Sequence, residues 1–188
     1  MEKRYEEYAY VLDFLPHGRP GARPAGRAGY RAGALVQLIG EGFFTLLEAL
    51  AKEDVMMKPH DRVYVGKESR RKITYIIGRI RHDELTTAAK MELPAGINKI
   101  VLAREEWFVN FFNTAQAVTP RMHALELIPG IGKKYMWQVI NEREKKPFED
   151  FEDLQSRTEI PSPVKLITKR ILEELAGESK YRLFTRSR

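Results

Sequence analysis

Residues 127–134 read Leu127-Ile128-Pro129-Gly130-Ile131-Gly132-Lys133-Lys134, and this stretch decides the fold of the C-terminal part. Gly130 and Gly132 permit a tight turn and leave backbone N–H groups accessible. A helix that begins near Lys133 points its unpaired N–H groups, and the positive end of its dipole, at the turn. Such a helix start attracts phosphate. The predicted phosphate-binding residues are Pro129, Gly130, Ile131, Gly132, Lys133 and Lys134.

The flanks of the turn predict helices on both sides. Residues 121–127 can form the first helix and residues 135–143 the second. The following run, Lys146–Leu154, predicts a connecting helix that packs through its apolar residues, Phe148, Phe151 and Leu154. Its acidic residues, Glu149, Asp150, Glu152 and Asp153, fall at the start of that helix, where they favour the dipole. We interpret them as a solvated helix start and not as a metal site.

A second helix-turn-helix unit follows. Ile160-Pro161-Ser162-Pro163-Val164 occupies the place of a second turn, but it has no glycine, and proline removes N–H donors. We therefore expect a degenerate turn that completes the fold, followed by a helix over residues 164–175. Its predicted core face is Ile167, Ile171, Leu172 and Leu175. Its basic residues Lys165, Lys169 and Arg170 could still contact a nucleic-acid backbone.

The N-terminal part predicts β-strands: Tyr8, Tyr10, Leu12 and Phe14 share one face at period two, and further segments are rich in Val, Ile and Tyr. The predicted strands are Tyr8–Leu15, Leu35–Ile39, Phe43–Leu50, Arg62–Val65 and Ile73–Ile80. Phe43–Leu50 also fits a short helix, and we favour a strand. Arg70-Arg71-Lys72 is expected at the tip of a hairpin. A short helix is predicted over Asp83–Met91 and a longer one over Arg104–Ala117, whose aromatic residues at i, i+4 spacing indicate core packing more than a base-stacking platform.

The segment Pro16–Gly33 is rich in arginine, glycine and proline. Arg19, Arg23, Arg27 and Arg31 recur at every fourth position, and the segment contains no acid. The interleaved Gly and Pro residues disfavour a helix. Arginine forms bidentate hydrogen bonds with phosphate, so we favour a mobile phosphate-binding loop over a solvated linker.

Composition narrows the class of protein. The chain has 188 residues, a formal net charge of +6 and no cysteine. A basic surface favours polyanions, and the missing cysteines exclude disulfides and thiolate chemistry. No apolar run is long enough to span a membrane, and the N-terminus lacks a signal peptide, so we expect a cytoplasmic location. The scattered histidines (His17, His60, His82 and His123) form no metal-binding motif, and no catalytic centre is indicated.

The turn and the run that follows it resemble tandem helix-hairpin-helix domains, including those of Holliday-junction and excision-repair proteins. Together with Ile73–Ile80, Trp107–Ala117 and Arg182–Thr185, they resemble one family of archaeal proteins of unknown function. The resemblance implies an α+β chain: an OB-like β-barrel over residues 1–118, then an all-α tandem helix-hairpin-helix domain over residues 119–188. In related hairpins a monovalent cation sits on the loop carbonyls, here those near Ile128, Gly130 and Gly132; no other cofactor is expected.

Two functions remain open. The first is nucleic-acid binding through backbone phosphates with little sequence preference. We favour RNA over DNA, because OB-like barrels and arginine-glycine loops suit single strands or structured RNA. The second is a protein-interaction adaptor whose helical domain docks a partner in a nucleic-acid-processing complex. Phosphate binding should weaken steeply with salt, whereas an apolar protein interface should not.

Overall fold

The computed structural model describes residues 5–19, 33–177 and 179–186. Contacts divide the chain into two units: unit 1 contains Met1–Gly96 and Phe184–Arg188, and unit 2 contains Ile97–Leu183. The division falls inside helix α1 (Thr87–Ala103), ahead of the boundary that the sequence suggests near Val118. The reason is that α1 is one continuous helix, so no loop marks the division.

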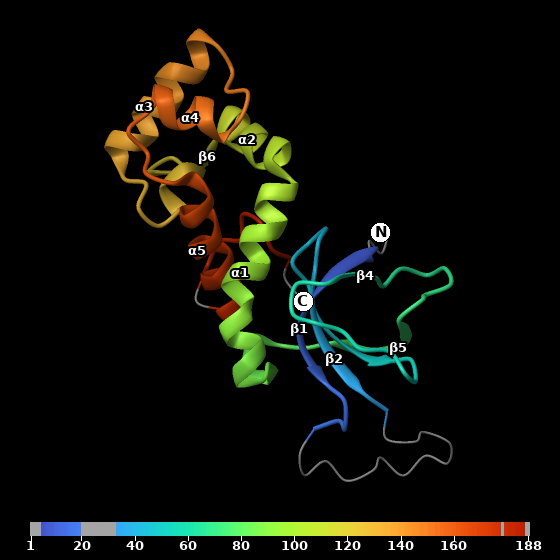
Figure 1. Cartoon of the computed structure of the whole chain (residues 1–188). Helices are drawn as coiled ribbons and strands as arrows, with labels where there is room; N and C mark the ends of the chain where they lie inside the picture. Colours follow the sequence, from blue (N-terminus) through green and yellow to red (C-terminus); the bar gives the residue numbers. More distant parts are fainter. Residues whose placement is uncertain (1–4, 20–32, 178, 187–188) are drawn as a thin grey trace. The chain divides into compact units, whose positions relative to one another are not determined.

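Unit 1 is built on an antiparallel sheet that curls into a half-barrel (Figure 1). Its strands are β1 (Tyr8–Leu15), β2 (Leu35–Gly40), β3 (Leu46–Ala51), β4 (Arg62–Tyr64) and β5 (Ile73–Arg79). Their spatial order is β4-β1-β2-β3-β5. The predicted strands and the mixed α+β class are confirmed, except that the strand predicted over Phe43–Leu50 begins only at Leu46, because Phe44 adopts a positive φ of +55°. Within the described residues no pairing joins the edge strands β4 and β5, so residues 70–72 do not form the tip of a hairpin.

Both faces of the central strands are buried. Ala9 and Val11 belong to a core of alternating aliphatic residues, whereas Leu12 and Ile39 are buried on the other side. There the backbone of α1 approaches them at Gly96, where an added Cβ would stand 3.3 Å from a Leu12 methyl carbon and 3.6 Å from Ile39 Cγ2. A register shift between Val11 and Asp13 marks a bulge in β1. Bulges bend strands, which fits the curl of this sheet.

Helix α1 differs from the prediction. The sequence suggests a short helix over Asp83–Met91, but the structure has a 3₁₀ turn at His82–Glu84 followed by α1, with Pro94 inside it. Proline in a helix interior costs about 3 kcal/mol. The fully buried side chains of Leu93, Ile97, Ile100 and Val101 offset this cost, since each buried aliphatic side chain contributes about 1.5–3 kcal/mol.

Helix α2 (Glu105–Thr114) confirms the helix predicted over Arg104–Ala117. Its aromatic residues divide between two environments. Phe108 and Phe112 are fully buried, as expected for a core stripe, whereas Trp107 is 44% exposed. The buried stripe of α2 is therefore narrower than the sequence predicted, because Trp107 does not belong to it.

The rest of unit 2 is mostly helical. After a short hairpin of β6 (Ala117–Thr119) and β7 (Met122–His123) come a 3₁₀ turn (Ala124–Leu127), α3 (Lys133–Lys145), α4 (Phe151–Arg157) and α5 (Pro163–Ala176). The helix predicted over residues 121–127 is wrong. His123 Nδ1 accepts a hydrogen bond from the Leu125 N–H at 3.1 Å, and the Glu126 carboxylate accepts one from the His123 N–H at 3.0 Å. These caps satisfy the backbone locally, and the helix stays one turn long.

Arg157 closes the C-terminal end of α3. Its guanidinium donates to the backbone carbonyls of Glu142 and Lys146, both at 2.6 Å, and lies 4.5 Å from the Phe148 ring. The last carbonyls of a helix have no partner within the helix. Arg157 supplies that partner from α4, so it fixes the C-terminal end of α3 to α4.

A buried ion pair holds the chain that follows α5. Glu174 is fully buried and accepts hydrogen bonds from Arg170 Nε at 3.0 Å and from the Leu183 N–H at 2.6 Å. Arg170 also donates to the Tyr181 carbonyl. Arg170 is thus part of the core, and the suggestion that it faces a nucleic-acid backbone is wrong. The next residues belong to unit 1, where the Arg186 guanidinium lies 3.7 Å above the Phe43 ring.

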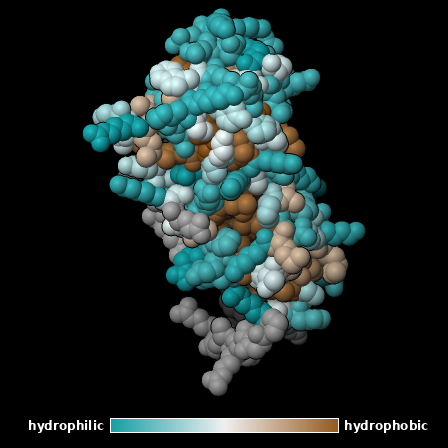
Figure 2. Space-filling model, turned by 90° about the vertical axis from the view of Figure 1, so that its left-hand side faces the viewer, coloured by the Kyte–Doolittle hydropathy of each residue, from teal (hydrophilic) through white to brown (hydrophobic). Residues whose placement is uncertain are grey.

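One face of the molecule is drawn with its hydropathy in Figure 2. On the face drawn in Figure 2, hydrophilic residues cover most of the area and apolar residues appear in patches between them. The most exposed large apolar side chains include Met56, Met91, Leu102 and Trp137. In the part of the chain that the structure describes, no helix has both the length and the apolarity needed to cross a membrane.

Candidate functional site

The predicted turn lies between the 3₁₀ turn and α3. Ile128 and Ile131 are buried and anchor it, and the Ile131 N–H donates to the Ile128 carbonyl at 3.0 Å. Gly130 adopts φ +92°, in the region that favours glycine. An added Cβ there would stand 2.9 Å from a methyl carbon of Leu166 on α5. The turn is therefore built for glycine at this position and packs against α5.

Gly132 plays a different part. It is the N-cap residue of α3, with φ −88° and ψ −173°, an extended conformation that any residue adopts. An added Cβ would meet nothing within 4 Å. A bulky residue at Gly132 would therefore not strain the backbone, and its main expected effect is to block the approach to the turn.

Free backbone donors face outward at this helix start. Gly132 has no side chain that could cap the helix. Within the described residues no acceptor is present for the N–H groups of Gly132 and Lys133. Gly130, Gly132, Lys133 and Lys134 are exposed at the surface. The arrangement gives an anion two donors, the helix dipole and two ammonium groups nearby.

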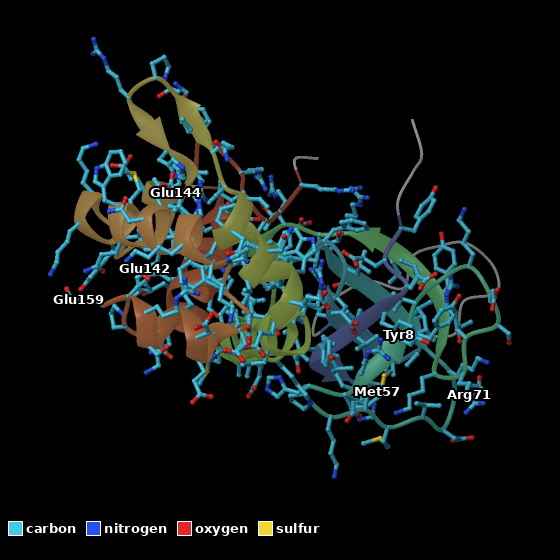
Figure 3. All side chains as sticks on the ribbon, turned by 90° about the horizontal axis from the view of Figure 1, so that it is seen from above. Tyr8, Met57, Arg71, Glu142, Glu144 and Glu159 are labelled. Carbon is cyan, nitrogen blue, oxygen red and sulfur yellow. The ribbon has the colours of Figure 1, made fainter. Side chains whose placement is uncertain are left out.

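Both lysines have carboxylate partners. Lys133 Nζ lies 3.2 Å from a Glu126 oxygen, and Lys134 pairs with Glu159, which lies at the surface of the helical unit (Figure 3). Hydrogen bonding to Glu159 raises the pKa of Lys134, and the same bond lowers the pKa of Glu159. The lysine side chains are 73% and 71% exposed. Exposed ion pairs contribute only about 0–1 kcal/mol, so an anion can displace them.

Glu126 connects the two sides of the turn. One carboxylate oxygen accepts the His123 N–H and the other contacts Lys133. The pKa of Glu126 is lowered mainly by the His123 N–H and further by Lys133. The pKa of His123 is also lowered, because burial and the nearby Arg143 disfavour the imidazolium. Its neutral form is the one that can accept the Leu125 N–H at Nδ1.

The second turn differs from the first in its backbone and in its donors. Its positive φ (+44°) lies at Ser162, the N-cap residue of α5, whereas in the first turn it lies at Gly130 and the N-cap residue Gly132 is extended. Ile160 is buried. Pro163 is the first residue of α5 and has no N–H. Lys165 and Lys169 are exposed one helical turn apart on α5. Leu166, which follows Lys165, is the residue of α5 that lies against Gly130.

The arginine-rich segment is described only at its start. Arg19 donates to the Glu48 carboxylate at 2.5 Å and more weakly to the Glu84 carbonyl, and its side chain is 40% exposed. Since Glu48 is nearly buried, a phosphate would compete with this pair for Arg19. Arg23, Arg27 and Arg31 lie outside the described residues.

The carbonyls suggested for a monovalent cation are partly engaged. The Ile128 carbonyl accepts the Ile131 N–H, and the Gly132 carbonyl accepts the Met136 N–H, each at 3.0 Å. A carbonyl has two lone pairs, so a cation remains compatible with both bonds. The cation therefore stays a prediction.

One candidate residue was missed in the sequence. Trp137 on α3 is 55% exposed and lies four residues after Lys133, hence on the same helix face. Its spacing from Lys133 in the predicted second helix was the available indication. It places an aromatic surface next to the basic turn.

Comparison with known proteins agrees with this architecture over nearly the whole chain. The model of the family described as "Protein of unknown function (DUF655)" matches residues 5–186. The chain belongs to this family. Family relatives come from archaea: the uncharacterized protein MJ0038 of Methanocaldococcus jannaschii is 41% identical, over 98% of this chain and 82% of its own length.

A solved member of the family has the same fold. The crystal structure of Af1531 from Archaeoglobus fulgidus superposes with a TM-score of 0.86 at 46% identity, and the match covers 96% of this chain and all of that chain. The resemblance to an archaeal family of unknown function is thus confirmed. The relatives' descriptions assign no activity or ligand to the turn at Gly130–Lys134.

Proposed function

We propose that this DUF655 protein binds nucleic acid, with RNA favoured over DNA, by docking backbone phosphate on the turn at Gly130–Lys134. The observation that carries the proposal is the exposed start of α3, where the N–H groups of Gly132 and Lys133 have no acceptor within the described residues. Backbone N–H groups recognise phosphate and not base edges. The expected binding therefore has little sequence preference.

The charges near the turn support the same function. Lys133 and Lys134 are ion-paired at the surface, so binding exchanges a carboxylate partner for a phosphate at small cost. Lys165, Lys169 and the arginines of residues 19–31 are the further basic groups that we assign to the same ligand. The helix-hairpin-helix and OB-like descriptions of the two units belong to this proposal.

The test uses two double variants of equal charge. Lys133→Ala with Lys134→Ala removes the pair at the start of α3. Lys145→Ala with Lys146→Ala removes a pair at its other end, where both lysines are also ion-paired and are 69% and 66% exposed. Affinity for a labelled single-stranded RNA and a labelled duplex DNA is measured across salt concentrations. The first variant should reduce the log–log salt slope for RNA by about 0.7 per lost phosphate contact.

The control variant should keep the slope and affinity of the parent. Equal losses in both variants would indicate diffuse charge attraction without a site at the turn. If neither variant affects binding at low salt and both are folded, the turn only packs against α5, and the adaptor function becomes the better hypothesis.

A further inference from the structure

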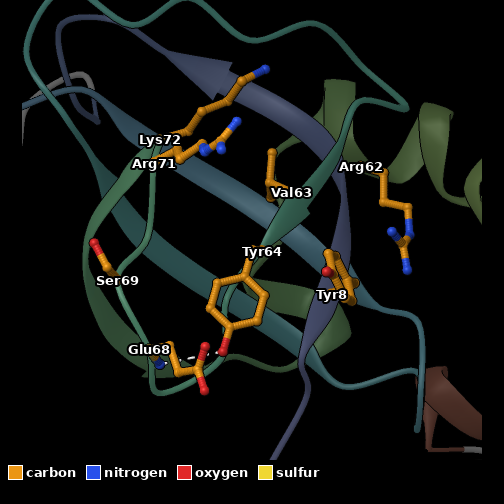
Figure 4. Close-up of a pocket in the computed structure, with 8 residues that line it drawn as sticks. All are labelled: Tyr8, Arg62, Val63, Tyr64, Glu68, Ser69, Arg71 and Lys72. Carbon is orange, nitrogen blue, oxygen red and sulfur yellow. Dashed lines mark hydrogen bonds between the residues drawn. The ribbon is translucent and has the colours of Figure 1, made fainter.

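A second candidate site lies in unit 1, beside edge strand β4. There a cavity of about 440 Å³ opens between β1, β4 and the loop that leads from β4 to β5 (Figure 4). Cavities of this size suit small organic ligands, which such sites hold by apolar contact and a few placed polar groups. The cavity lining contains two tyrosines, three basic side chains and one carboxylate.

One end of the cavity is positively charged. Arg71 and Lys72 extend from the same end of the loop (Figure 4). Arg71 is exposed, and no hydrogen bond or ion pair is present for it within the described residues. Lys72 has only a distant carboxylate, Asp61 at 3.9 Å. Arg62, by contrast, is held by two contacts to Glu41, at 2.6 and 3.2 Å. Arg71 and Lys72 are therefore the cations available to an anion.

The aromatic wall of the cavity is held in place. The Tyr64 hydroxyl accepts the Glu68 N–H at 3.3 Å, and the ring packs edge-on to Tyr8 at 5.4 Å. The Arg62 guanidinium covers the Tyr8 ring at 3.6 Å. A Cβ at Gly66 would overlap the Tyr64 hydroxyl, so the absence of a side chain there is what lets the ring lie where it does. A ligand would meet a ring that is already positioned.

The far end of the cavity carries acceptors. Glu68 lies beside the Tyr64 ring, away from Lys72, and Ser69 lies on the loop between Glu68 and Arg71 (Figure 4). The cavity thus offers cations at one end and an aromatic ring beside a carboxylate at the other, with the Ser69 hydroxyl between the two ends. Inorganic phosphate would use only the first of these features.

We propose that this cavity binds a nucleotide, with its phosphate at Arg71 and Lys72 and its base against Tyr64. Arginine and lysine supply charged donors to phosphate oxygens, and stacking on tyrosine suits any base. Glu68 and Ser69 face the sugar hydroxyls or base N–H groups, which donate hydrogen bonds. The site is independent of the turn in unit 2, and either can exist without the other.

The test measures adenosine monophosphate binding to the full chain by isothermal titration calorimetry, with tetraadenylate as a second probe. Arg71→Ala with Lys72→Ala should weaken binding of the better probe by about tenfold or more, because two charged donors are lost. Lys58→Ala with Lys90→Ala is the matched control, since both lysines are exposed in unit 1 and neither lines the cavity. The control should bind like the parent.

The aromatic contribution has its own pair of variants. Tyr64→Leu should weaken binding by about tenfold, whereas Tyr64→Phe, which keeps the ring and loses only the long hydrogen bond from the Glu68 N–H, should retain most of the affinity. Circular dichroism checks that each variant is folded. Binding of the mononucleotide supports a free nucleotide as the ligand, and binding of tetraadenylate alone supports a nucleotide within a chain.

Three results would overturn the proposal: no heat with either probe, equal affinities for the Arg71/Lys72 variant and its control, or competition by inorganic phosphate as strong as that by the mononucleotide. The Lys133/Lys134 variant should bind the mononucleotide like the parent. Failure at the turn and failure at this cavity are thus separate results.

Discussion

Replacing each glycine of the turn by alanine should separate the fold of the turn from its function. At Gly130, with φ +92°, alanine must adopt a conformation that costs about 1–2 kcal/mol. Its Cβ would also press on Leu166 at 2.9 Å, although a methyl group at the end of a side chain can shift. Alanine also reduces the conformational entropy of the unfolded chain, and this stabilises the folded state by about 0.4–1 kcal/mol. We expect Gly130→Ala to lower the free energy of unfolding by about 1 kcal/mol.

At Gly132 the same substitution should have little effect on stability. The backbone conformation is open to any residue and no atom lies within 4 Å of the added Cβ. The lower entropy of the unfolded chain stabilises the alanine variant by about 0.4–1 kcal/mol. A destabilisation of similar size opposes it, because alanine is a poorer N-cap residue than glycine. The net change should stay within about 0.5 kcal/mol. The added methyl group, however, stands beside the N–H groups assigned to phosphate, so Gly132→Ala should weaken nucleic-acid binding.

Urea unfolding followed by tryptophan fluorescence measures both effects on stability. The chain has two tryptophans, Trp107 and Trp137, and both lie in unit 2, so the signal reports on the unit that contains the turn. Equal destabilisation by the two variants would refute the assignment of the left-handed conformation to Gly130 alone. A Gly132→Ala variant with the stability and the affinity of the parent would refute the phosphate site.

Three further predictions concern the polar contacts of unit 2, each checked by urea unfolding. Glu174→Gln should destabilise by about 3 kcal/mol, because Arg170 is left charged and buried; stability equal to the parent would contradict this. Arg157→Ala should cost about 1.5–3 kcal/mol through the loss of charged hydrogen bonds to two carbonyls, and Arg157→Lys should recover part of it. The pKa of His123 is lowered by burial and a nearby arginine, so the unfolded state takes up the proton first and stability should fall as pH drops below about 6.5. His123→Asn should remove that component of the pH dependence, and an unchanged profile would contradict it.

The strands could be predicted because their pattern is local. The shared face of Tyr8, Tyr10, Leu12 and Phe14, and the Ile and Tyr residues of Ile73–Arg79, are properties of each strand by itself, although both faces of β1 are buried. Whether the sheet closes into a barrel could not be predicted in this way. It depends on whether β4 pairs with β5, which involves residues far apart in the sequence.

Helix α1 and the cavity show the other limit. Pro94 and Gly96 oppose a helix locally, and the helix exists because side chains around them find burial in the folded chain. Arg71 belongs to a basic run and Tyr64 lies near the end of a predicted strand, so the sequence does not connect them. The loop between β4 and β5 brings both residues to one cavity. The turn at Gly130–Lys134, whose residues are contiguous, could be placed from the sequence.

The return of the chain to unit 1 has a consequence for how unit 2 unfolds. Phe184 is buried and Arg186 stacks on Phe43, so both ends of the inserted segment Ile97–Leu183 are attached to the same unit. While those two residues stay docked, an unfolded unit 2 is a closed loop with fewer conformations than a chain with a free end. The chain contains no cysteine, so no disulfide can close this loop. The docked residues Phe184 and Arg186 restrict the unfolded segment as a disulfide would, but reversibly, and only by as much free energy as their own contacts provide.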